Sequence, residues 1–303
     1  MSQKADLAGS IKKLKEAKGA VILAHNYQLP EVQKVADFTG DSLELSRKAA
    51  RADGEVIVFC GVHFMAEVAA ILSPEKTVIL PEAQAGCPLA DSITAQALRD
   101  LKKDHPEAPV VSYVNSSAAV KAESDICVTS SNAVNVVNSL PEEKFIFVPD
   151  QNLGKFVADQ TGKEVINCQG YCPSHHVATV EDVKAARENY PQAPIVVHPE
   201  CKPEVTWAAD QVLSTGKMLK YAQTSEHTQI VVGTETGILY RLQQENPEKE
   251  FYPLSQEMVC PDMKLIDLEK LNQALKNLEP RITVPEEIAE PARGALERML
   301  SIV

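Results

Sequence analysis

The chain repeats one pattern three times, and this period constrains its fold more than any other feature. A cysteine followed by a proline occurs at Cys87, Cys172 and Cys260, so the steps between the pairs are 85 and 88 residues. After the first two pairs, the sequence runs through helical spacing into similar proline-containing segments, at 105–109 and 190–194. A fixed period of this length indicates a structural unit that is repeated along the chain.

Two further markers recur with nearly the same steps. One is a polar residue at the end of an apolar run, and the other is a hydroxyl residue that opens a helix-like stretch. They are His25, Tyr113 and His198 for the first marker, and Ser42, Ser130 and Thr215 for the second. Three independent markers with one period make coincidence remote.

Short β-branched runs alternate with segments of helical spacing throughout the sequence. The apolar runs are 21–23, 56–59, 77–80, 110–113, 145–148, 195–197 and 230–232, and helical examples are 42–52, 94–103, 180–189 and 267–278. This alternation predicts parallel sheets covered by helices, with the functional loops at the carboxyl ends of the strands.

The period also decides the number of units. A length of 303 residues by itself suggests two domains, at about 150 residues each. The repeats instead give three units of roughly 86 residues, each too small to be very stable alone. We therefore predict an α/β fold of three pseudo-symmetric, three-layer αβα domains with short parallel sheets around a central cavity. The expected boundaries are 1–90, 91–175 and 176–284, with a C-terminal helix over 285–303 packed on the first unit.

The charge and hydropathy of the chain exclude several classes of partner. The sequence has 30 Lys and Arg residues against 42 Asp and Glu residues, a formal charge of -12, which opposes generic binding to nucleic acids or anionic membranes. No segment resembles a signal peptide or approaches the roughly 20 apolar residues of a membrane span. We expect a cytoplasmic protein with small anionic ligands, held by backbone amides and a few placed side chains.

The seven cysteines are scattered, and their odd number argues against a disulfide framework. They are Cys60, Cys87, Cys127, Cys168, Cys172, Cys201 and Cys260. Three cysteines on three separate loops favour a [4Fe–4S] cluster over structural zinc, which normally has four protein ligands. A missing fourth cysteine would leave one iron open as a Lewis acid. We predict the periodic cysteines as ligands, treat Cys60 and Cys127 as buried thiols, and rank Cys168 and Cys201 lower because they break the period.

The predicted strand-end loops carry polar side chains suited to a ligand crevice. His198 and Glu200 fall on the same side of an extended segment and could act as an acid/base pair. The periodic Ser and Thr residues have two compatible interpretations, as helix N-caps or as part of anion sites at helix N-termini. No phosphate-binding nucleotide motif is present. We expect His175 and His176 to form a surface or outer pair.

Several motifs together closely resemble the quinolinate synthase (NadA) family, over nearly the whole chain. They are Ala24-His25-Asn26-Tyr27-Gln28, Gly40-Asp41-Ser42-Leu43, Tyr113-Val114-Asn115-Ser116, Val197-His198-Pro199-Glu200-Cys201, Ser214-Thr215-Gly216 and Gly233-Thr234-Glu235. The resemblance implies three αβα domains with one [4Fe–4S] cluster at their junction. Each domain would give one cysteine, which points to the same three periodic positions.

The resemblance also implies a reaction and a set of site residues. Members of the family condense iminoaspartate (iminosuccinate) with dihydroxyacetone phosphate to quinolinate, releasing phosphate and water, in NAD biosynthesis. The matching substrate-binding positions are His25, Ser42, Tyr113, Val114, Asn115, Ser130, His198, Pro199, Glu200 and Thr215. We expect Glu200, His198 and Tyr27 to transfer protons, and transient contact with the enzyme that produces iminoaspartate. The alternatives are an aconitase-like hydro-lyase and a non-enzymatic iron–sulfur carrier.

Overall fold

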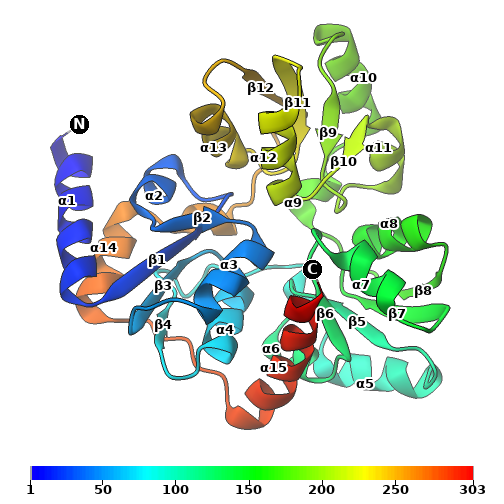
Figure 1. Cartoon of the computed structure of the whole chain (residues 1–303), viewed down its shortest axis with the longest axis horizontal. Coiled ribbons are helices and arrows are strands. Elements are labelled where there is room, and N and C mark those ends of the chain that lie inside the picture. The colour runs from blue at the N-terminus through cyan, green and yellow to red at the C-terminus, as the bar shows by residue number, and fades with distance from the viewer. Residues whose placement is uncertain (1, 303) are drawn as a thin grey trace.

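A computed structural model of the chain describes residues 2–302, and this part contains three four-stranded parallel sheets (Figure 1). The strand orders are β2-β1-β3-β4, β6-β5-β7-β8 and β10-β9-β11-β12, which is one topology used three times. In each sheet, the first strand of the unit lies inside and the second forms an edge. The predicted α/β fold of three αβα domains is therefore confirmed.

The first sheet and its helices lie in the N-terminal third of the chain. Its strands are β1 (Ala20–His25), β2 (Phe38–Gly40), β3 (Val56–Cys60) and β4 (Thr77–Ile79), with helices α1 (Ser2–Ala17), α2 (Pro30–Val35), α3 (Ser42–Ala50) and α4 (His63–Leu72) and the short turn η1 (Ala90–Ser92). All five residues of β3 are buried, as expected for a central parallel strand covered on both faces.

The second and third sheets repeat this arrangement. The second has β5 (Val110–Tyr113), β6 (Ile126–Val128), β7 (Lys144–Val148) and β8 (Glu164–Asn167), with α5 (Ala95–Asp104), α6 (Ala118–Ala122), α7 (Ala133–Ser139) and α8 (Gln151–Thr161). The third has β9 (Ile195–Val197), β10 (Gln211–Val212), β11 (Gln229–Gly233) and β12 (Glu250–Pro253), with α10 (Val180–Asn189), α11 (Pro203–Ala208), α12 (Thr215–Thr224) and α13 (Ile238–Glu245). The short helix α9 (Pro173–His176) lies between the second and third sheets in the chain order, and η2 (Asp262–Leu265) follows the third sheet.

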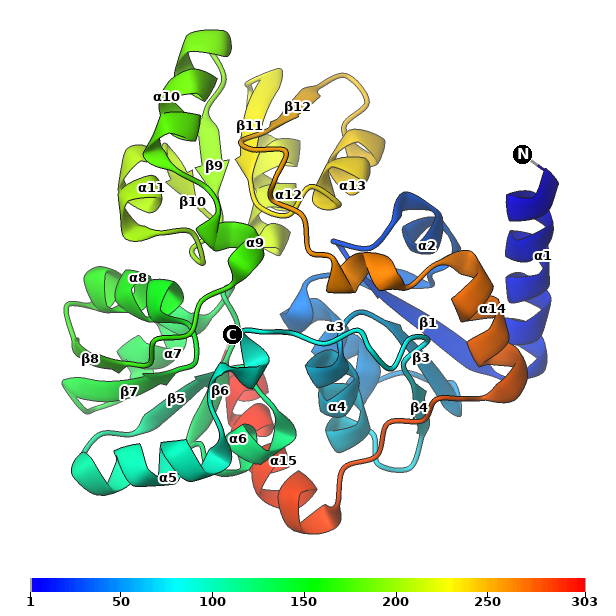
Figure 2. The ribbon, with the colours of Figure 1, turned by 180° about the vertical axis from the view of Figure 1, so that it is seen from behind.

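The two C-terminal helices pack away from the third unit, α14 on the first unit and α15 on the second and first units. Helix α14 (Leu268–Asn277) returns to pack on α1, and Ser10 Oγ donates a hydrogen bond to Asn272 Oδ1 at 2.8 Å (Figure 2). Helix α15 (Glu286–Ser301) packs mainly on α6 and β6, and less extensively on α4. The first unit was its expected partner, but its larger contact is with the second.

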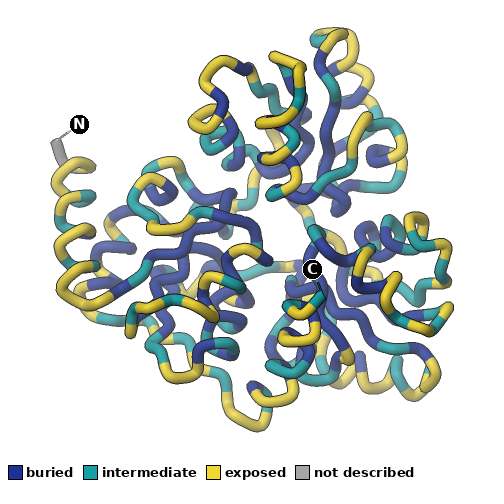
Figure 3. Tube along the Cα trace, in the orientation of Figure 1, coloured by how far each residue is buried: buried dark blue, intermediate teal, exposed yellow. Residues whose placement is uncertain are grey.

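The buried parts of the chain are the sheets and the segments at the junction of the three units, whereas the outer helices carry the exposed residues (Figure 3). Within residues 2–302, no helix combines the length and the apolar character needed to cross a membrane.

Candidate active site at the junction of the three units

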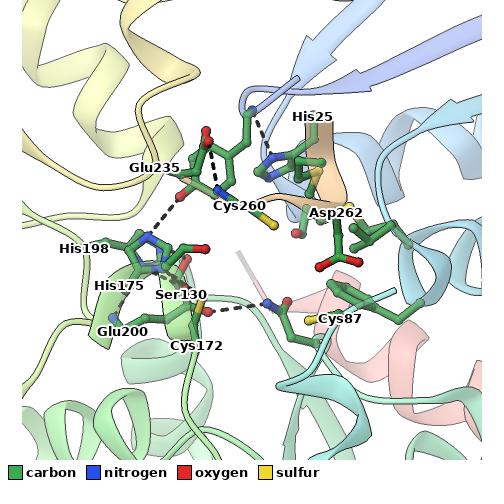
Figure 4. Close-up of a pocket in the computed structure, with 18 of the residues that line it drawn as sticks. His25, Cys87, Ser130, Cys172, His175, His198, Glu200, Glu235, Cys260 and Asp262 are labelled. Carbon is green, nitrogen blue, oxygen red and sulfur yellow. Dashed lines mark hydrogen bonds and ion pairs between the residues drawn. The ribbon is translucent and has the colours of Figure 1, made fainter. Parts of the chain in front are cut away.

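The strand register brings the periodic polar residues to one place. His25 pairs with Gly40 across β1 and β2, and Tyr113 pairs with Val128 across β5 and β6. Because the carboxyl ends of parallel strands share one edge of a sheet, Ser42 and its counterparts emerge beside these residues in each unit. The three edges face a common cavity (Figure 4).

Most of the predicted site residues line this cavity. They are His25, Tyr27, Ser42, Cys87, Tyr113, Asn115, Ser130, Cys172, His198, Glu200, Thr215 and Cys260. Val114 and Pro199 are buried next to lining residues but do not line the cavity themselves. Val114 instead contributes to a small adjoining void that it shares with Ser42. The geometry thus gathers twelve of the fourteen predicted positions from all three units.

Each periodic cysteine lies one to three residues before a short helical element, and proline is the next residue. Cys87 precedes η1, Cys172 is the N-cap of α9, and Cys260 precedes η2. Backbone amides two and three residues further on donate to the sulfurs of Cys87 and Cys260, from Leu89 and Ala90 in the first case. Amides at the start of a helical turn stabilise a thiolate, so this local structure suits sulfur ligands of a metal.

The thiols of these three cysteines favour the neutral form in the absence of a metal. Burial, with smaller contributions from the nearby Cys260 and Glu200, raises the pKa of Cys87 to about 12 against the opposing backbone amides. Burial likewise raises the pKa of Cys172 well above its usual value, with Glu200 and Cys87 adding to the shift. A bound metal cation deprotonates coordinating thiols and compensates their charge. The donor set therefore fits a cationic metal centre.

The other four cysteines lie elsewhere. Cys60 and Cys127 are buried in the central core of the first two units. Cys201 is 1% exposed, with its Sγ 3.7 Å from the carbonyl oxygen of Gly233. Cys168 packs on the apolar cluster beneath β7. None of the four lines the central cavity.

A second group of donors lies beside Cys172. Its Sγ is 3.2 Å from His175 Nδ1, and this nitrogen is 2.7 Å from Glu200 Oε2. Ligand atoms of the three residues all lie within 4.8 Å of one another, so the group could hold a metal ion.

Hydrogen bonds link Glu200 to Tyr27 across the cavity. His175 Nδ1 contacts the Glu200 carboxylate, and His175 Nε2 lies 2.7 Å from Thr234 Oγ1. Thr234 Oγ1 in turn lies 2.6 Å from Tyr27 Oη. With the tyrosine hydroxyl donating to Thr234, and Thr234 donating to His175, this chain connects two predicted proton-transfer residues from different units.

The rings of His25 and His198 are oriented by the same local contact. The backbone N–H of Tyr27 donates to His25 Nδ1 at 3.2 Å, and that of Glu200 donates to His198 Nδ1 at 3.3 Å. In His25 the Nδ1 that accepts this N–H carries no proton, so the neutral ring has its proton on Nε2. His198 Nδ1 also lies 3.3 Å from Glu200 Oε2, to which a protonated Nδ1 can donate. His198 Nε2 lies 3.1 Å from Ser130 Oγ.

The electrostatics of the site follow from burial and from neighbouring charge. Burial lowers the pKa of His25 to about 3 and also lowers the pKa of His198. Burial alone would raise the pKa of Glu200, but His175 and His198 outweigh it and lower that pKa well below the usual value. Burial and the Glu200 charge raise the pKa of Tyr27 well above its usual value. An ionised Glu200 carboxylate thus lies in the same cavity as the protonated phenol of Tyr27 and the neutral ring of His25.

The periodic hydroxyls are not the helix caps, contrary to one of the two interpretations. Asp41 caps α3, accepting the Glu44 N–H at 2.9 Å, so Ser42 is the first helical residue. Ser214 caps α12 in the same way, which leaves Thr215 as its first residue. The side chains of Asp41 and Ser214 therefore cap the two helices, and the hydroxyls of Ser42 and Thr215 can bind a ligand in the cavity.

Two functional positions were missed by sequence reasoning. His175 was expected in a surface or outer pair, but it is 1% exposed, lines the cavity and stacks on His198 with ring centroids 4.6 Å apart. Glu235 also lines it, accepts the Cys260 N–H at 3.2 Å and pairs with Lys264 at 2.8 Å. His175 does not recur with the period, whereas Glu235 has an acidic counterpart 85 residues earlier, Asp150, which accepts the backbone N–H of Cys172. The sequence feature that could have indicated His175 is its place beside Cys172-Pro173, and for Glu235 it is the Gly233-Thr234-Glu235 motif.

The cavity gathers a buried carboxylate, a phenol, imidazoles and three thiols, which is the donor set of an enzyme site that could bind a metal ion and a small polar substrate. The comparisons with known proteins agree with this class. The family model for "Quinolinate synthetase A protein" matches residues 9–301, and the chain belongs to this family of quinolinate synthases.

Individual relatives are similar over their whole length. A quinolinate synthase of Dehalococcoides mccartyi (strain CBDB1) is 56% identical over 297 residues, covering 98% of each chain. Quinolinate synthase 1 of Methanosarcina acetivorans is 53% identical over 300 residues, covering 99% of each. A quinolinate synthase of Geobacter sp. (strain M21) is 53% identical over 296 residues, covering 98% of this chain and 97% of the relative.

Proposed function

We propose that the central cavity condenses iminoaspartate (iminosuccinate) with dihydroxyacetone phosphate to form quinolinate, releasing one phosphate and two water molecules. The observation that carries the proposal is the meeting of family-matched side chains from all three units at one cavity. Four carboxylates line this cavity, from Asp41, Glu200, Glu235 and Asp262, together with imidazoles, hydroxyls and the Asn115 amide, which can donate hydrogen bonds to small anions. Family membership and site chemistry therefore support the same reaction.

We further propose that Cys87, Cys172 and Cys260 hold one [4Fe–4S] cluster with one iron left open. Support comes from their convergence on the cavity and from the amide donors that follow Cys87 and Cys260. When bound, a cluster with an open iron would supply Lewis acidity toward oxygen groups of the substrates.

Substrate anions would be held by side chains that have no capping role. Ser42 and Thr215 begin their helices, so their hydroxyls adjoin free amides and the positive end of the helix dipole. Ser130 lies beside His198 Nε2 and extends this polar surface into the second unit. His25 presents a neutral ring whose Nε2–H can donate to a carboxylate or carbonyl oxygen.

Proton transfers are assigned to the ends of the hydrogen-bonded chain. Glu200 is ionised and buried, which suits a general base. Tyr27 is protonated and suits a general acid, and Thr234 and His175 connect it to Glu200. His198 contacts Glu200 Oε2 at 3.3 Å and orients it from the other side.

The deciding assay is anaerobic incubation of the purified chain with both substrates, followed by measurement of quinolinate. We expect quinolinate from the wild type and a loss of at least about a hundredfold in turnover from Glu200→Gln, which removes the base. The iron–sulfur absorption spectrum should be unchanged in that variant. Normal turnover of Glu200→Gln would overturn the assignment of the base.

Iron content tests the ligands separately. Cys260→Ser should lose the four-iron cluster, whereas Cys201→Ser, a buried thiol outside the cavity, should keep it. Four irons per chain in Cys260→Ser would contradict the proposed ligand set.

The same assay addresses the alternatives. An aconitase-like hydro-lyase would interconvert a hydroxy acid and its dehydrated form without consuming dihydroxyacetone phosphate. An iron–sulfur carrier would convert neither the hydroxy acid nor dihydroxyacetone phosphate. The Tyr27–Thr234–His175 contacts suit proton transfer, which an iron–sulfur carrier does not perform. We also propose a cytoplasmic location. Because imines hydrolyse in water, we further propose transient contact with the enzyme that produces iminoaspartate.

A further inference from the structure

We propose that, in the chain without its cluster, Cys172, His175 and Glu200 form a site for a single Zn²⁺ ion. Cys172 Sγ and Glu200 Oε2 lie on either side of His175 Nδ1, at 3.2 and 2.7 Å. Ligands about 2.0 to 2.3 Å from a tetrahedral Zn²⁺ are roughly 3.3 to 3.8 Å apart. Small side-chain movements therefore convert the observed contacts into a coordination sphere.

The chemistry of the donors also favours zinc. Thiolate, imidazole and carboxylate are its three usual protein ligands. One thiolate, one carboxylate and one neutral imidazole balance the +2 charge of the ion, so binding leaves no net charge in a buried place. The step releases one proton, from the Cys172 thiol, while the His175 proton moves from Nδ1 to Nε2. The fourth position would face the cavity and hold water.

Surrounding groups already orient the three ligands. His175 Nε2 lies 2.7 Å from Thr234 Oγ1, which can accept its proton once Nδ1 binds metal. Asn115 Nδ2 donates to Glu200 Oε1 at 3.4 Å, which leaves Oε2 for the ion. The side chains of His175 and Glu200 are only 2% and 3% exposed, so their conformations are held by packing. Such outer contacts raise metal affinity by fixing ring and carboxylate orientation.

A zinc ion bound at this site would prevent the proposed reaction. Cys172 would be withheld from the cluster, and Glu200 and His175 from the proton path. This consequence rests on the proposed cluster and mechanism, whereas the binding of zinc does not.

The binding test uses the full-length chain freed of iron, titrated with Zn²⁺ against a chromophoric chelator. We expect one ion per chain. The Cys87→Ser/Cys260→Ser double variant should bind within about threefold of the wild type, because those thiols are not ligands. His175→Asn and Glu200→Gln should each weaken binding at least about tenfold. His176→Asn, at the half-buried neighbouring ring, is the matched control and should have no effect.

Two outcomes would overturn the proposal. One is loss of zinc affinity in the double variant, which would mean that the three periodic thiols hold the ion. The other is unchanged affinity in both His175→Asn and Glu200→Gln. Circular dichroism checks that each variant is folded. Co²⁺ gives a second readout, since its charge-transfer absorption should report one thiolate and disappear in Cys172→Ser.

Competition between Zn²⁺ binding and cluster assembly is measured in a separate experiment. One equivalent of Zn²⁺, added before iron and sulfide, should slow cluster assembly in the wild type, as followed by absorbance and iron content. Failure to assemble a cluster without zinc would count against the proposed function and leave the zinc titration intact. Normal assembly in the presence of bound zinc would refute the competition.

Discussion

His25 shows how burial of a single ionisable residue couples the site to pH. Its side chain is 4% exposed, and burial lowers its pKa from 6.5 to about 3. The Glu200 carboxylate opposes this shift, whereas the nearby His198, Lys264 and His175 add to it. The folded protein therefore holds His25 neutral at a pH where the unfolded chain protonates it.

This difference predicts how stability depends on pH. Below pH 6.5 the unfolded state takes up the proton and the folded state does not, so His25 lowers the free energy of unfolding as pH falls toward 3. The loss approaches about 1.4 kcal/mol per pH unit. In the cluster-free protein, urea unfolding at pH 6.5 and 5.5 should show a shallower decline for His25→Asn than for the wild type. Equal declines would mean that His25 is protonated in the folded state.

Which residues could be predicted from sequence depended on repetition. Twelve of the predicted positions line the cavity because most recur with the period or stand two residues from one that does. His175 has no counterpart in the other repeats: Ala90 and Met263 occupy the equivalent places, three residues after Cys87 and Cys260. A histidine without a periodic partner cannot be distinguished from a surface residue by spacing alone.

At the scale of the elements, the start of helix α12 is tied to the first unit through Asp41. This carboxylate caps α3 and also accepts the backbone N–H of Gly216. A Cβ on Gly216 would stand 2.7 Å from Asp41 Oδ2, which is closer than atoms in contact can approach. Glycine is needed here for close approach between two units.

Gly216→Ala should therefore break this contact. We expect a loss of about 1 to 2 kcal/mol in the free energy of unfolding, since a buried carboxylate loses a hydrogen bond. Turnover should also fall because Ser42 and Thr215 begin the two helices concerned. Gly9→Ala is the matched control: Gly9 lies in α1 with no atom near its Cβ position, and alanine there should add about 0.5 to 1 kcal/mol. A stabilising Gly216→Ala would show that Asp41 moves without cost.

The elements that sequence reasoning found are those with strong apolar runs. It located every inner strand, and helices α3, α5, α10 and α14 to within two residues at either end. It missed β2, β6, β8, β10 and β12, which all lie at sheet edges. Edge strands are short or partly exposed, as in β10 with two residues, so their sequences carry little β-pattern.

For the whole molecule, the period predicted three units where length alone suggested two, but it could not place the terminal helices. The sheets fall within 1–90, 91–175 and 176–284, which we propose as the unit boundaries. Helix α15 lies outside the repeats and spans two of them. Arg298 Nε donates to the Asp125 carbonyl of the second unit, and Arg293 Nε donates to that of Ile71 in the first at 2.9 Å.

Leu296 tests whether this helix couples the units. It is fully buried in the core that extends through α15, so Leu296→Ala should lower the free energy of unfolding by about 2 to 5 kcal/mol. Because α15 packs on both α6 and α4, hydrogen exchange should accelerate in both helices. Glu297→Ala, at the exposed neighbouring position, should stay within about 0.5 kcal/mol of the wild type. Acceleration confined to α6 would mean that α15 belongs to the second unit alone and that the first is stabilised independently.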